Sequence, residues 1–334
     1  MKPDSTLDPT DHTFLTSGVA KLEHLGIIRV TGADAASFLQ GQLTNDVVLL
    51  GMNESRLAAF CSAKGRMQAS FTIYKRAAVD EAQTTPDIYM VCSRDILAAT
   101  LKRLSMFIMR AKAKLTDVTD QFSIFGLTGN AINLVATKAI NTPAIVIFNT
   151  STVIALHSAV GQSRALCITP TGEAAPAGEV LSTELWNWAE VHAGIATITA
   201  PVVDAFVPQM LNYESVGGVN FKKGCYPGQE VVARSQFRGT LKRRAFVAQI
   251  SATNNDENVQ PFVSQEVFHD SDAEQACGTL VQVAKNPSFY PNAGYSAIVS
   301  MQVSASVSGK LTLGSATGAN ITLQALPYLL LEDI

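Results

Sequence analysis

The chain has 334 residues, of which 47% are hydrophobic and 16% are charged, and its net charge is −3. This composition is that of a globular protein with a large core, and the length is sufficient for about two or three domains. The five cysteines include no CxxC pair, which argues against a disulfide framework and a structural zinc site and favours a reducing, cytoplasmic location. No apolar run reaches the ~18 residues of a membrane span, so we expect no membrane partner.

The first third of the chain predicts a mixed α+β unit. Residues 1–17 are polar and lack the apolar segment of a signal peptide, so we expect a disordered or loosely attached tail. Apolar periodicity then predicts helices at 34–40 and 95–107 and strands at 27–31, 56–61, 67–75, 88–93, 112–118 and 122–127. We interpret this order as a first, ferredoxin-like α+β half at residues 18–128.

A weaker echo of this pattern predicts a second α+β half at residues 129–241. Its helices are expected at 130–140 and 181–192, and its strands at 145–148, 153–157 and 166–169, with 144–155 forming a hairpin. Residues 242–334 predict an all-β domain, a small barrel or sandwich. Its strands are expected at 245–250, 266–269, 278–284, 296–303 and 310–313, and a polar surface loop at 251–260.

The most distinctive stretch is residues 222–234, which we call the signature. Gly224 and Gly228 permit backbone angles that a side chain would forbid. Pro227 fixes its own φ and biases the residue before it away from helix. Cys225 is therefore predicted to lie on a tight, stiff turn. The apolar run 231–233 can open a helix or a strand.

Cys225 is the candidate reactive group. Lys222, Lys223 and Arg234 are close in sequence, and nearby cations favour the reactive thiolate. No histidine lies within thirty residues of Cys225, so a redox or cluster-related role fits better than nucleophilic catalysis. The alternative is that Cys225 is a small buried hydrophobic residue.

The charge around the signature is uneven. Residues 220–244 contain seven Lys or Arg and one acid, Glu230. This gives a local charge of +6 (seven minus one) on a chain with a net charge of −3. An anionic partner that docks at this strip is one interpretation; a solvated charged face is the other.

The run Lys-Gly-Cys-Tyr-Pro-Gly-Gln-Glu at 223–230, followed by Ala233 and Arg234, resembles the signature of the YgfZ family. These are folate-binding proteins related to the T-protein, the aminomethyltransferase of glycine cleavage. Segments 32–46 and 60–67 resemble two further family blocks, and the resemblance runs from about residue 18 to the C-terminus. It implies an α+β fold with two ferredoxin-like halves around a central folate cavity, followed by a C-terminal β-barrel.

The resemblance also implies a function and a set of residues. The function is tetrahydrofolate binding in support of iron–sulfur cluster assembly or repair, and thereby of iron–sulfur enzymes such as those that modify tRNA. The partners implied are a folate and iron–sulfur assembly factors or client proteins, and the protein is expected to be a monomer. The residues implied in binding the folate or a derivative of it are Lys64, Lys223, Gly224, Tyr226, Gln229, Glu230 and Arg234, with Cys225 as the reactive thiol and no bound metal.

Two of these roles have a chemical basis, and each has an alternative. Glu230, with Gln229, could accept parallel N–H bonds from a pterin, although a helix cap is an equally good explanation of an acid there. Arg234 could bind the carboxylates of the folate tail, but it fits a solvated face equally well. Lys64 lies on a predicted hairpin turn, where a solvated lysine is also expected.

One departure from the T-protein pattern concerns catalysis. The acid that supports aminomethyl transfer is replaced here at about Gln68 and Ala69, neither of which can exchange a proton. A folate-dependent aminomethyltransferase is therefore the second hypothesis, and whether the protein is an enzyme stays open, with binding favoured over turnover. An RNA-binding accessory protein is the third; sparse aromatic residues near the cationic strip and the negative net charge argue against direct nucleic-acid binding.

Overall fold

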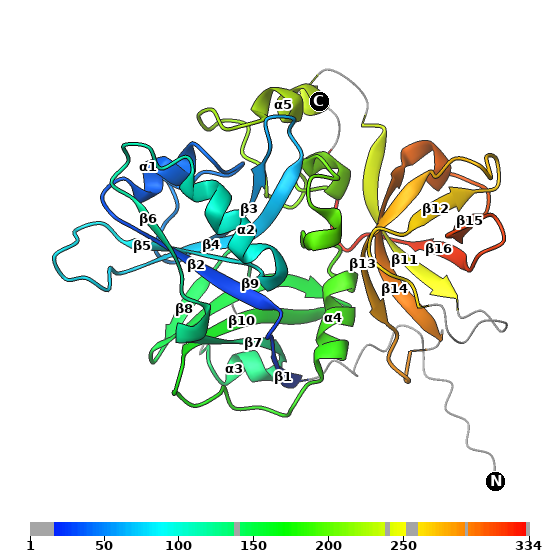
Figure 1. Cartoon of the computed structure of the whole chain (residues 1–334). Helices are drawn as coiled ribbons and strands as arrows, with labels where there is room; N and C mark the ends of the chain where they lie inside the picture. The colour runs from blue at the N-terminus through cyan, green and yellow to red at the C-terminus, as the bar shows by residue number, and fades with distance from the viewer. Residues whose placement is uncertain (1–16, 137–140, 238–240, 252–259, 291–292, 332–334) are drawn as a thin grey trace, which may run out of the picture.

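The computed structural model describes residues 17–136, 141–237, 241–251, 260–290 and 293–331 (Figure 1). Its strands form two five-stranded antiparallel sheets and one closed barrel. The first sheet has the order β3 (Ser55–Cys61), β4 (Met67–Arg76), β5 (Asp87–Ser93), β2 (Leu25–Thr31) and β6 (Lys114–Asp117). The second has the order β1 (Ser17–Lys21), β7 (Phe122–Gly129), β10 (Gln162–Pro170), β9 (Ser151–Ala159) and β8 (Ile145–Phe148).

The two sheets pack face to face because their strands have apolar residues on both sides. Along β5 the side chains alternate between two hydrophobic clusters: Met90 and Cys92 belong to the larger one, and Tyr89 and Val91 to the smaller one. The smaller cluster also contains Leu166 of β10, so it fills the space between the sheets. Burial of each large apolar side chain there contributes roughly 1.5–3 kcal/mol.

The sheets do not follow the expected division of the chain at residues 128 and 129. Strand β7 pairs with β1 and β10, so residues 17–21 and 122–129 belong to the second sheet and not to the first. The boundaries of domains remain a prediction. The hairpin expected at 144–155 is confirmed by β8 and β9, which are joined at Asn149 in a left-handed conformation (φ 52°).

The helices are α1 (Ala35–Gln40), α2 (Arg94–Ser105), α3 (Asn130–Asn133), α4 (Thr183–His192) and α5 (Gln229–Phe237). Short 3-10 helices are η2 (Thr119–Gln121), η3 (Ala200–Val202), η4 (Pro208–Leu211) and η5 (Val303–Ser306). The helix expected at 130–140 is therefore shorter, and residues 137–140 lie outside the described residues. No helix among the described residues has the length and apolarity to cross a membrane.

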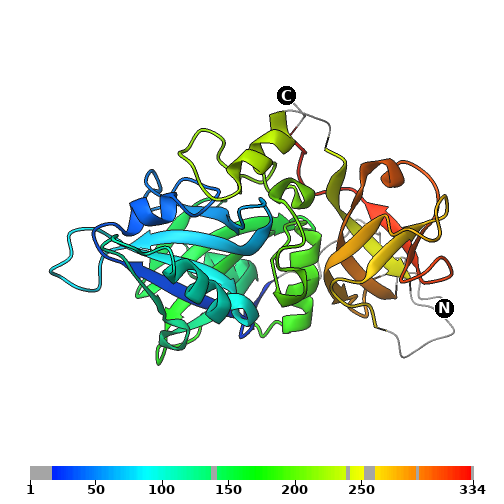
Figure 2. The same ribbon diagram turned by 45° about the horizontal axis from the view of Figure 1, so that its top comes forward.

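Helix α4 stands between the sheets and the barrel (Figures 1 and 2). The hydroxyl of Ser182 accepts the Leu185 N–H at 3.1 Å and caps the first turn of α4. Trp186 and Trp188 are both fully buried, in the smaller and the larger cluster respectively, so α4 is fixed on two sides. At its last turn, the His192 ring lies 3.0 Å from the Ser296 hydroxyl of the barrel.

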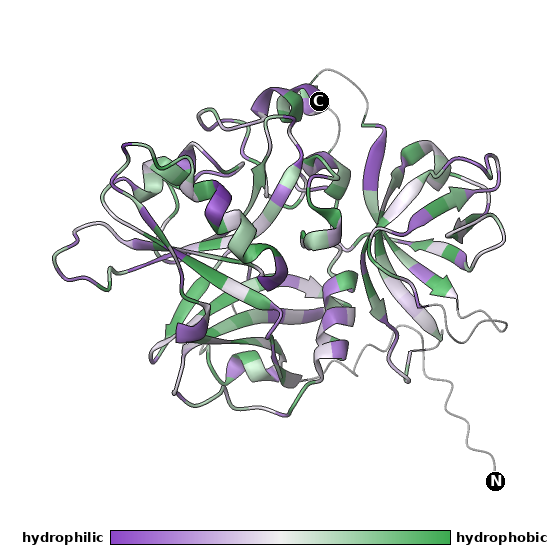
Figure 3. Ribbon diagram, viewed as in Figure 1, coloured by the Kyte–Doolittle hydropathy of each residue, from purple (hydrophilic) through white to green (hydrophobic). Residues whose placement is uncertain are grey.

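The C-terminal β-barrel is confirmed. Its strands close in the order β11 (Arg243–Ser251), β14 (Gly294–Gln302), β13 (Gly278–Lys285), β12 (Glu266–His269), β15 (Leu311–Leu313) and β16 (Asn320–Gln324). The last of these was not expected, and most of the expected loop at 251–260 lies outside the described residues. Figure 3 shows hydrophobic residues concentrated along the strands of both sheets and the barrel.

Candidate functional site

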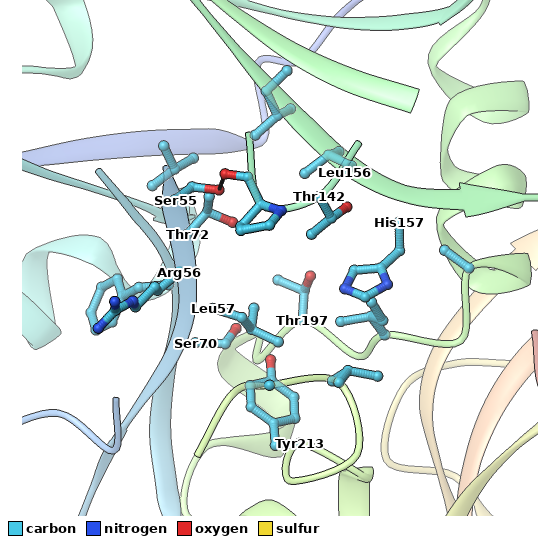
Figure 4. Close-up of a pocket in the computed structure, with 18 of the residues that line it drawn as sticks. Ser55, Arg56, Leu57, Ser70, Thr72, Thr142, Leu156, His157, Thr197 and Tyr213 are labelled. Carbon is cyan, nitrogen blue, oxygen red and sulfur yellow. Dashed lines mark hydrogen bonds between the residues drawn. The ribbon is translucent and has the colours of Figure 1, made fainter. Parts of the chain in front are cut away.

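A cavity of about 510 Å³ lies between the two sheets and α4 (Figure 4). Ser55, Leu57, Ser70 and Thr72 of β3 and β4 form one wall, and His157 of β9 faces them from the other. The polar residues that line the cavity include Asn45, Arg56, Arg164, Glu190, Tyr213 and Asn220. A mostly apolar cavity of this size with a few polar groups is typical of a small-molecule site.

A buried ion pair gives the cavity its strongest polar feature. The Arg164 side chain of β10 is 3% exposed, and its Nη2 donates to Oε1 of Glu190 on α4 at 2.9 Å. The guanidinium also lies 4.4 Å from the ring centroid of Trp186. Burial lowers the pKa of Arg164, and the Glu190 charge opposes this shift. A carboxylate offers about four lone-pair sites, so Glu190, whose side chain is 20% exposed, retains capacity to accept hydrogen bonds from a ligand.

Two further polar side chains approach the cavity from different walls (Figure 4). Tyr213 donates its hydroxyl hydrogen to the Ala196 carbonyl at 2.6 Å, which fixes the ring. Burial and the nearby Arg164 charge lower the pKa of His157, so its imidazole is neutral at pH 7. A neutral imidazole can donate and accept a hydrogen bond at the same time.

His157 also lines a second cavity of about 360 Å³ beside the first. Thr142, Leu156 and Ala193 are likewise shared, so the two spaces adjoin at these residues. The second cavity is otherwise lined by Asn141, Ser158, Ser163, Pro327 and Tyr328. Together they can hold a ligand longer than the central cavity alone.

Arg56, although it lines the cavity, is held by a neighbouring loop. Its guanidinium donates to the carbonyls of Asp46 (2.7 Å) and Leu49 (3.1 Å), and to the Glu54 carboxylate at 3.0 Å. Burial opposes ionisation of Asp46, but hydrogen bonds from Leu49 N–H and Gln40, with the Arg56 and Lys223 charges, hold its pKa below the usual range.

The signature forms a surface turn that leads into α5. Cys225 is exposed, whereas the four other cysteines are buried. Gly228, at φ +79°, packs against the turn between β3 and β4: a Cβ on it would lie 2.5 Å from the Gly65 Cα. The structure therefore brings the 60–67 segment and the signature together. The run at 231–233 is helical, as one of the two expectations had it, and Glu230 lies in the first turn of α5.

The other residues that the resemblance implied occupy different positions. Lys64 and Gly224 are exposed, and Lys223 and Tyr226 are buried. Gln229 begins α5, and Glu230 pairs with Arg234 at 2.5 Å on the helix surface, with 83% and 64% of their side chains exposed. None of these residues, nor Cys225, is among the described residues that line the central cavity. Their roles in ligand binding remain predictions.

Sequence reasoning missed Arg164, Glu190, His157 and Tyr213. An arginine next to the apolar run 165–168 was the available signal for Arg164. Gln68, at the position of the missing acid, is buried with Oε1 unpaired. It lies on β4 in the same alternation as Ser70 and Thr72, which line the cavity.

Two antiparallel sheets that enclose a cavity, followed by a β-barrel, form the fold of the aminomethyltransferase T class. The same fold is seen in the aminomethyltransferase T of the glycine cleavage system from Bartonella henselae, with a TM-score of 0.63 and 15% identity over 97% of this chain and 90% of that one. Residues 8–173 match the GCVT N-terminal domain.

Sequence similarity specifies the family within this class. The chain is 30% identical over 252 residues to the tRNA-modifying protein YgfZ of Photorhabdus laumondii, covering 72% of this chain and 73% of the relative. It is 28% identical over 232 residues to an uncharacterized protein of Haemophilus influenzae, covering 69% and 73%. The chain belongs to the YgfZ family, which is related to the glycine-cleavage aminomethyltransferases.

Proposed function

We propose that the protein binds tetrahydrofolate or a derivative of it in the central cavity, and that it thereby supports iron–sulfur cluster assembly or repair. The observation that carries the binding proposal is the buried Arg164–Glu190 pair on the wall of a largely apolar cavity. The family of the chain supports the choice of a folate over other flat ligands.

The cavity suits the chemistry of a reduced pterin. An aminopyrimidinone presents parallel N–H groups, for which a carboxylate is the natural acceptor. Glu190 is the carboxylate held at the wall, and Arg164 fixes its orientation through the 2.9 Å bond. Leu57 and Leu156 provide apolar surface for the flat ring system, and the second cavity beyond His157 gives room for the rest of the ligand.

Among the described residues, the position at which the resemblance expects the acid of aminomethyl transfer holds an amide. Gln68 stands where the acid is expected, and an amide cannot take or give a proton at neutral pH. Ser70 and Thr72, further along β4, line the cavity with hydroxyls that are poor general bases without a partner. We therefore propose binding of the folate rather than aminomethyl turnover.

Cys225 is assigned to the second part of the function. Its thiol is on the surface, where a protein partner can reach it, and it does not line the ligand cavity. The name of the Photorhabdus relative supports a link to tRNA modification. We propose that the partners are iron–sulfur assembly factors or client enzymes, that the protein acts as a monomer, and that it works in the cytoplasm, where an exposed thiol stays reduced.

Titration calorimetry tests the binding proposal. Tetrahydrofolate and its methyl and formyl derivatives are expected to bind with dissociation constants of about 1–10 μM, or roughly −7 to −8 kcal/mol. A pteridine without the pyrimidine amino group is the control for recognition by a carboxylate, and is expected to bind more weakly. Failure of every reduced folate to give a binding heat, at two temperatures, would reject the proposal.

A second candidate, RNA binding, is favoured by one groove. A space of about 850 Å³ between α5 and the barrel is lined by Arg234, Lys242 and Arg243, and no acid is among its described lining residues. Phosphate contacts by such residues give binding that falls steeply with salt. If this candidate is right, labelled tRNA should bind the protein at low salt, and unlabelled tRNA should displace it. Absence of any binding at 50 mM salt would exclude it.

A further inference from the structure

Lys223 differs from its neighbours in the signature because it is buried. It is 8% exposed, whereas Lys222 and Gly224 on either side are exposed. Its ammonium donates to the carbonyl oxygens of Gln40 and Leu43, the latter at 2.6 Å. It also lies 4.8 Å from the ring centroid of Tyr226, a distance at which cation–π attraction operates. Groups of the protein itself therefore surround this ammonium.

The acceptors of Lys223 explain why a cation is needed at this point. Gln40 is the last residue of α1, and the carbonyls at the end of a helix have no partner within the helix. A lysine supplies up to three donors and a positive charge that such carbonyls favour. A neutral side chain of the same length, such as methionine, would leave both carbonyls without this donor.

The segment 40–46, which Lys223 contacts, also contributes Asn45 to the lining of the central cavity. Thr44 donates its hydroxyl hydrogen to the Gly218 carbonyl at 2.7 Å, and Asn45 donates its amide to the Gly217 carbonyl at 2.6 Å. The N–H of Asn220 returns to the Thr44 carbonyl at 2.9 Å. Asn45, Gly217 and Asn220 line the cavity. One hydrogen-bonded layer thus joins the cavity to the turn that carries Cys225.

We propose that Lys223 is a positioning residue for Cys225, and that its ammonium pins the signature turn to the segment 40–46 so that the exposed thiol is held at a fixed place on the protein surface. This role differs from the ligand contact that the family resemblance implied for Lys223. It rests on the proposed role of Cys225 in supporting iron–sulfur enzymes, but the pinning itself can be measured without any ligand or partner.

A nitroxide spin label on Cys225 measures the pinning, because Cys225 is the exposed cysteine and the four others are buried. In the wild type the label should be immobile. Lys223→Met should make it mobile, whereas Lys222→Met, which removes one charge from the exposed neighbouring lysine, should not. Lys223→Arg, which keeps the charge and the donors, should restore part of the immobility.

The labelled protein also gives a test that does not depend on a substitution folding correctly. Burial lowers the pKa of Lys223 to about 8, against the opposing charges of Asp46 and Cys225. Labelling Cys225 removes its charge, and that charge raises this pKa, so the ammonium of the labelled protein titrates at or below about pH 8. With Asp46 ionised and Tyr226 un-ionised throughout, the ammonium is the group that titrates between pH 6 and pH 9 among those facing it. Label mobility should rise over this range in the wild type and stay constant in Lys223→Arg.

Function is then compared in cells that lack the wild-type gene. Lys223→Met should lower the activity of iron–sulfur enzymes about tenfold or more, the scale of a lost charge-assisted hydrogen bond. The affinity for folate in the cavity should stay within about threefold of the wild type, less than the loss of one hydrogen bond.

A label that remains immobile in Lys223→Met, together with a loss of folate affinity, would overturn the proposal and return Lys223 to the ligand site. Equal effects of Lys222→Met would overturn it in favour of a general charge effect. Loss of folate binding in the wild type would reject the cavity proposal and leave the label result standing.

Discussion

Gly65 and Gly228 meet backbone to backbone, with a Cβ on Gly228 placed only 2.5 Å from the Cα of Gly65. Both have a positive φ, +72° and +79°, which residues with a side chain rarely adopt. This contact docks the signature turn on the turn between β3 and β4. It gives a physical reason for two glycines in segments far apart in the sequence.

Gly228→Ala should therefore destabilise the protein. The new Cβ would lie 2.4 Å from the Ser62 carbonyl oxygen, and the left-handed conformation adds its own strain. We expect a loss of about 2 kcal/mol or more in the free energy of unfolding, measured by urea denaturation. Gly224→Ala is the matched control, because a Cβ there meets nothing within 4 Å. It should change the free energy by less than about 0.5 kcal/mol, and equal losses in both variants would contradict the docking argument.

Glu190→Gln tests the polar end of the cavity. The amide keeps the shape of the side chain but loses the charge and half of the acceptor capacity. Affinity for tetrahydrofolate, measured by calorimetry, should fall about 10- to 100-fold, the scale of a hydrogen bond to a charged group. Glu184→Gln on the exposed face of the same helix is the control, and should leave affinity unchanged. Unchanged affinity in Glu190→Gln would remove this carboxylate from the binding site.

Local patterns in the sequence predicted the elements well, because they depend on neighbours in the chain. The hairpin at 144–155, the helix α4 and the barrel follow from such patterns. The signature predicted a turn at Cys225 for the same reason, since Gly228 permits a positive φ and Pro227 fixes its own φ. These features depend on residues that are close to each other in the sequence.

Features that depend on distant residues were not predictable in this way. Arg164 and Glu190 come together only because β10 and α4 pack against each other. The burial of Lys223 depends on carbonyls in the segment 40–46, and a lysine in a cationic run is normally expected in solvent. The pairing of β7 with β10 in the second sheet likewise depends on residues that lie far apart in the sequence. A sequence pattern indicates that a residue needs a partner, but it does not identify which distant residue that partner is.

The pH dependence of stability should carry a contribution from His157. Its pKa in the folded protein is below the usual value of about 6.5, so the unfolded chain takes up the proton first on acidification. The stabilisation is complete above about pH 6.5 and is lost as the pH falls through the folded pKa, by at most about 1.4 kcal/mol per pH unit. Urea denaturation at pH 7.5, 6.5, 5.5 and 5.0 should show a shallower decline for His157→Gln than for the wild type.

The exposed His24 supplies the control for this experiment. His24→Gln should leave the slope of stability against pH as it is in the wild type. A His157→Gln protein that loses stability toward low pH as steeply as the wild type would mean that other groups, such as the ionised Asp46, account for the whole decline.

The last prediction concerns the thiol of Cys225. Burial raises the pKa of Cys61 and of Cys92 to about 12 and also raises that of Cys167 and Cys277, so these four thiols are both covered and protonated at neutral pH. Cys225 is exposed. Brief treatment of the folded protein with iodoacetamide at pH 7 should add a single label at Cys225, as read by mass spectrometry of peptides.

Cys225→Ser tests the role of the thiol independently of folding and of folate binding. Oxygen replaces sulfur at an exposed turn, so the free energy of unfolding should change by less than about 0.5 kcal/mol. Folate affinity should also be kept, because Cys225 does not line the cavity. The variant should nevertheless fail to restore iron–sulfur enzyme activity in cells that lack the protein, since a hydroxyl neither binds iron as a thiolate does nor forms disulfides. Full restoration by the serine variant would show that the thiol is dispensable, and would leave ligand binding in the cavity as the activity to explain.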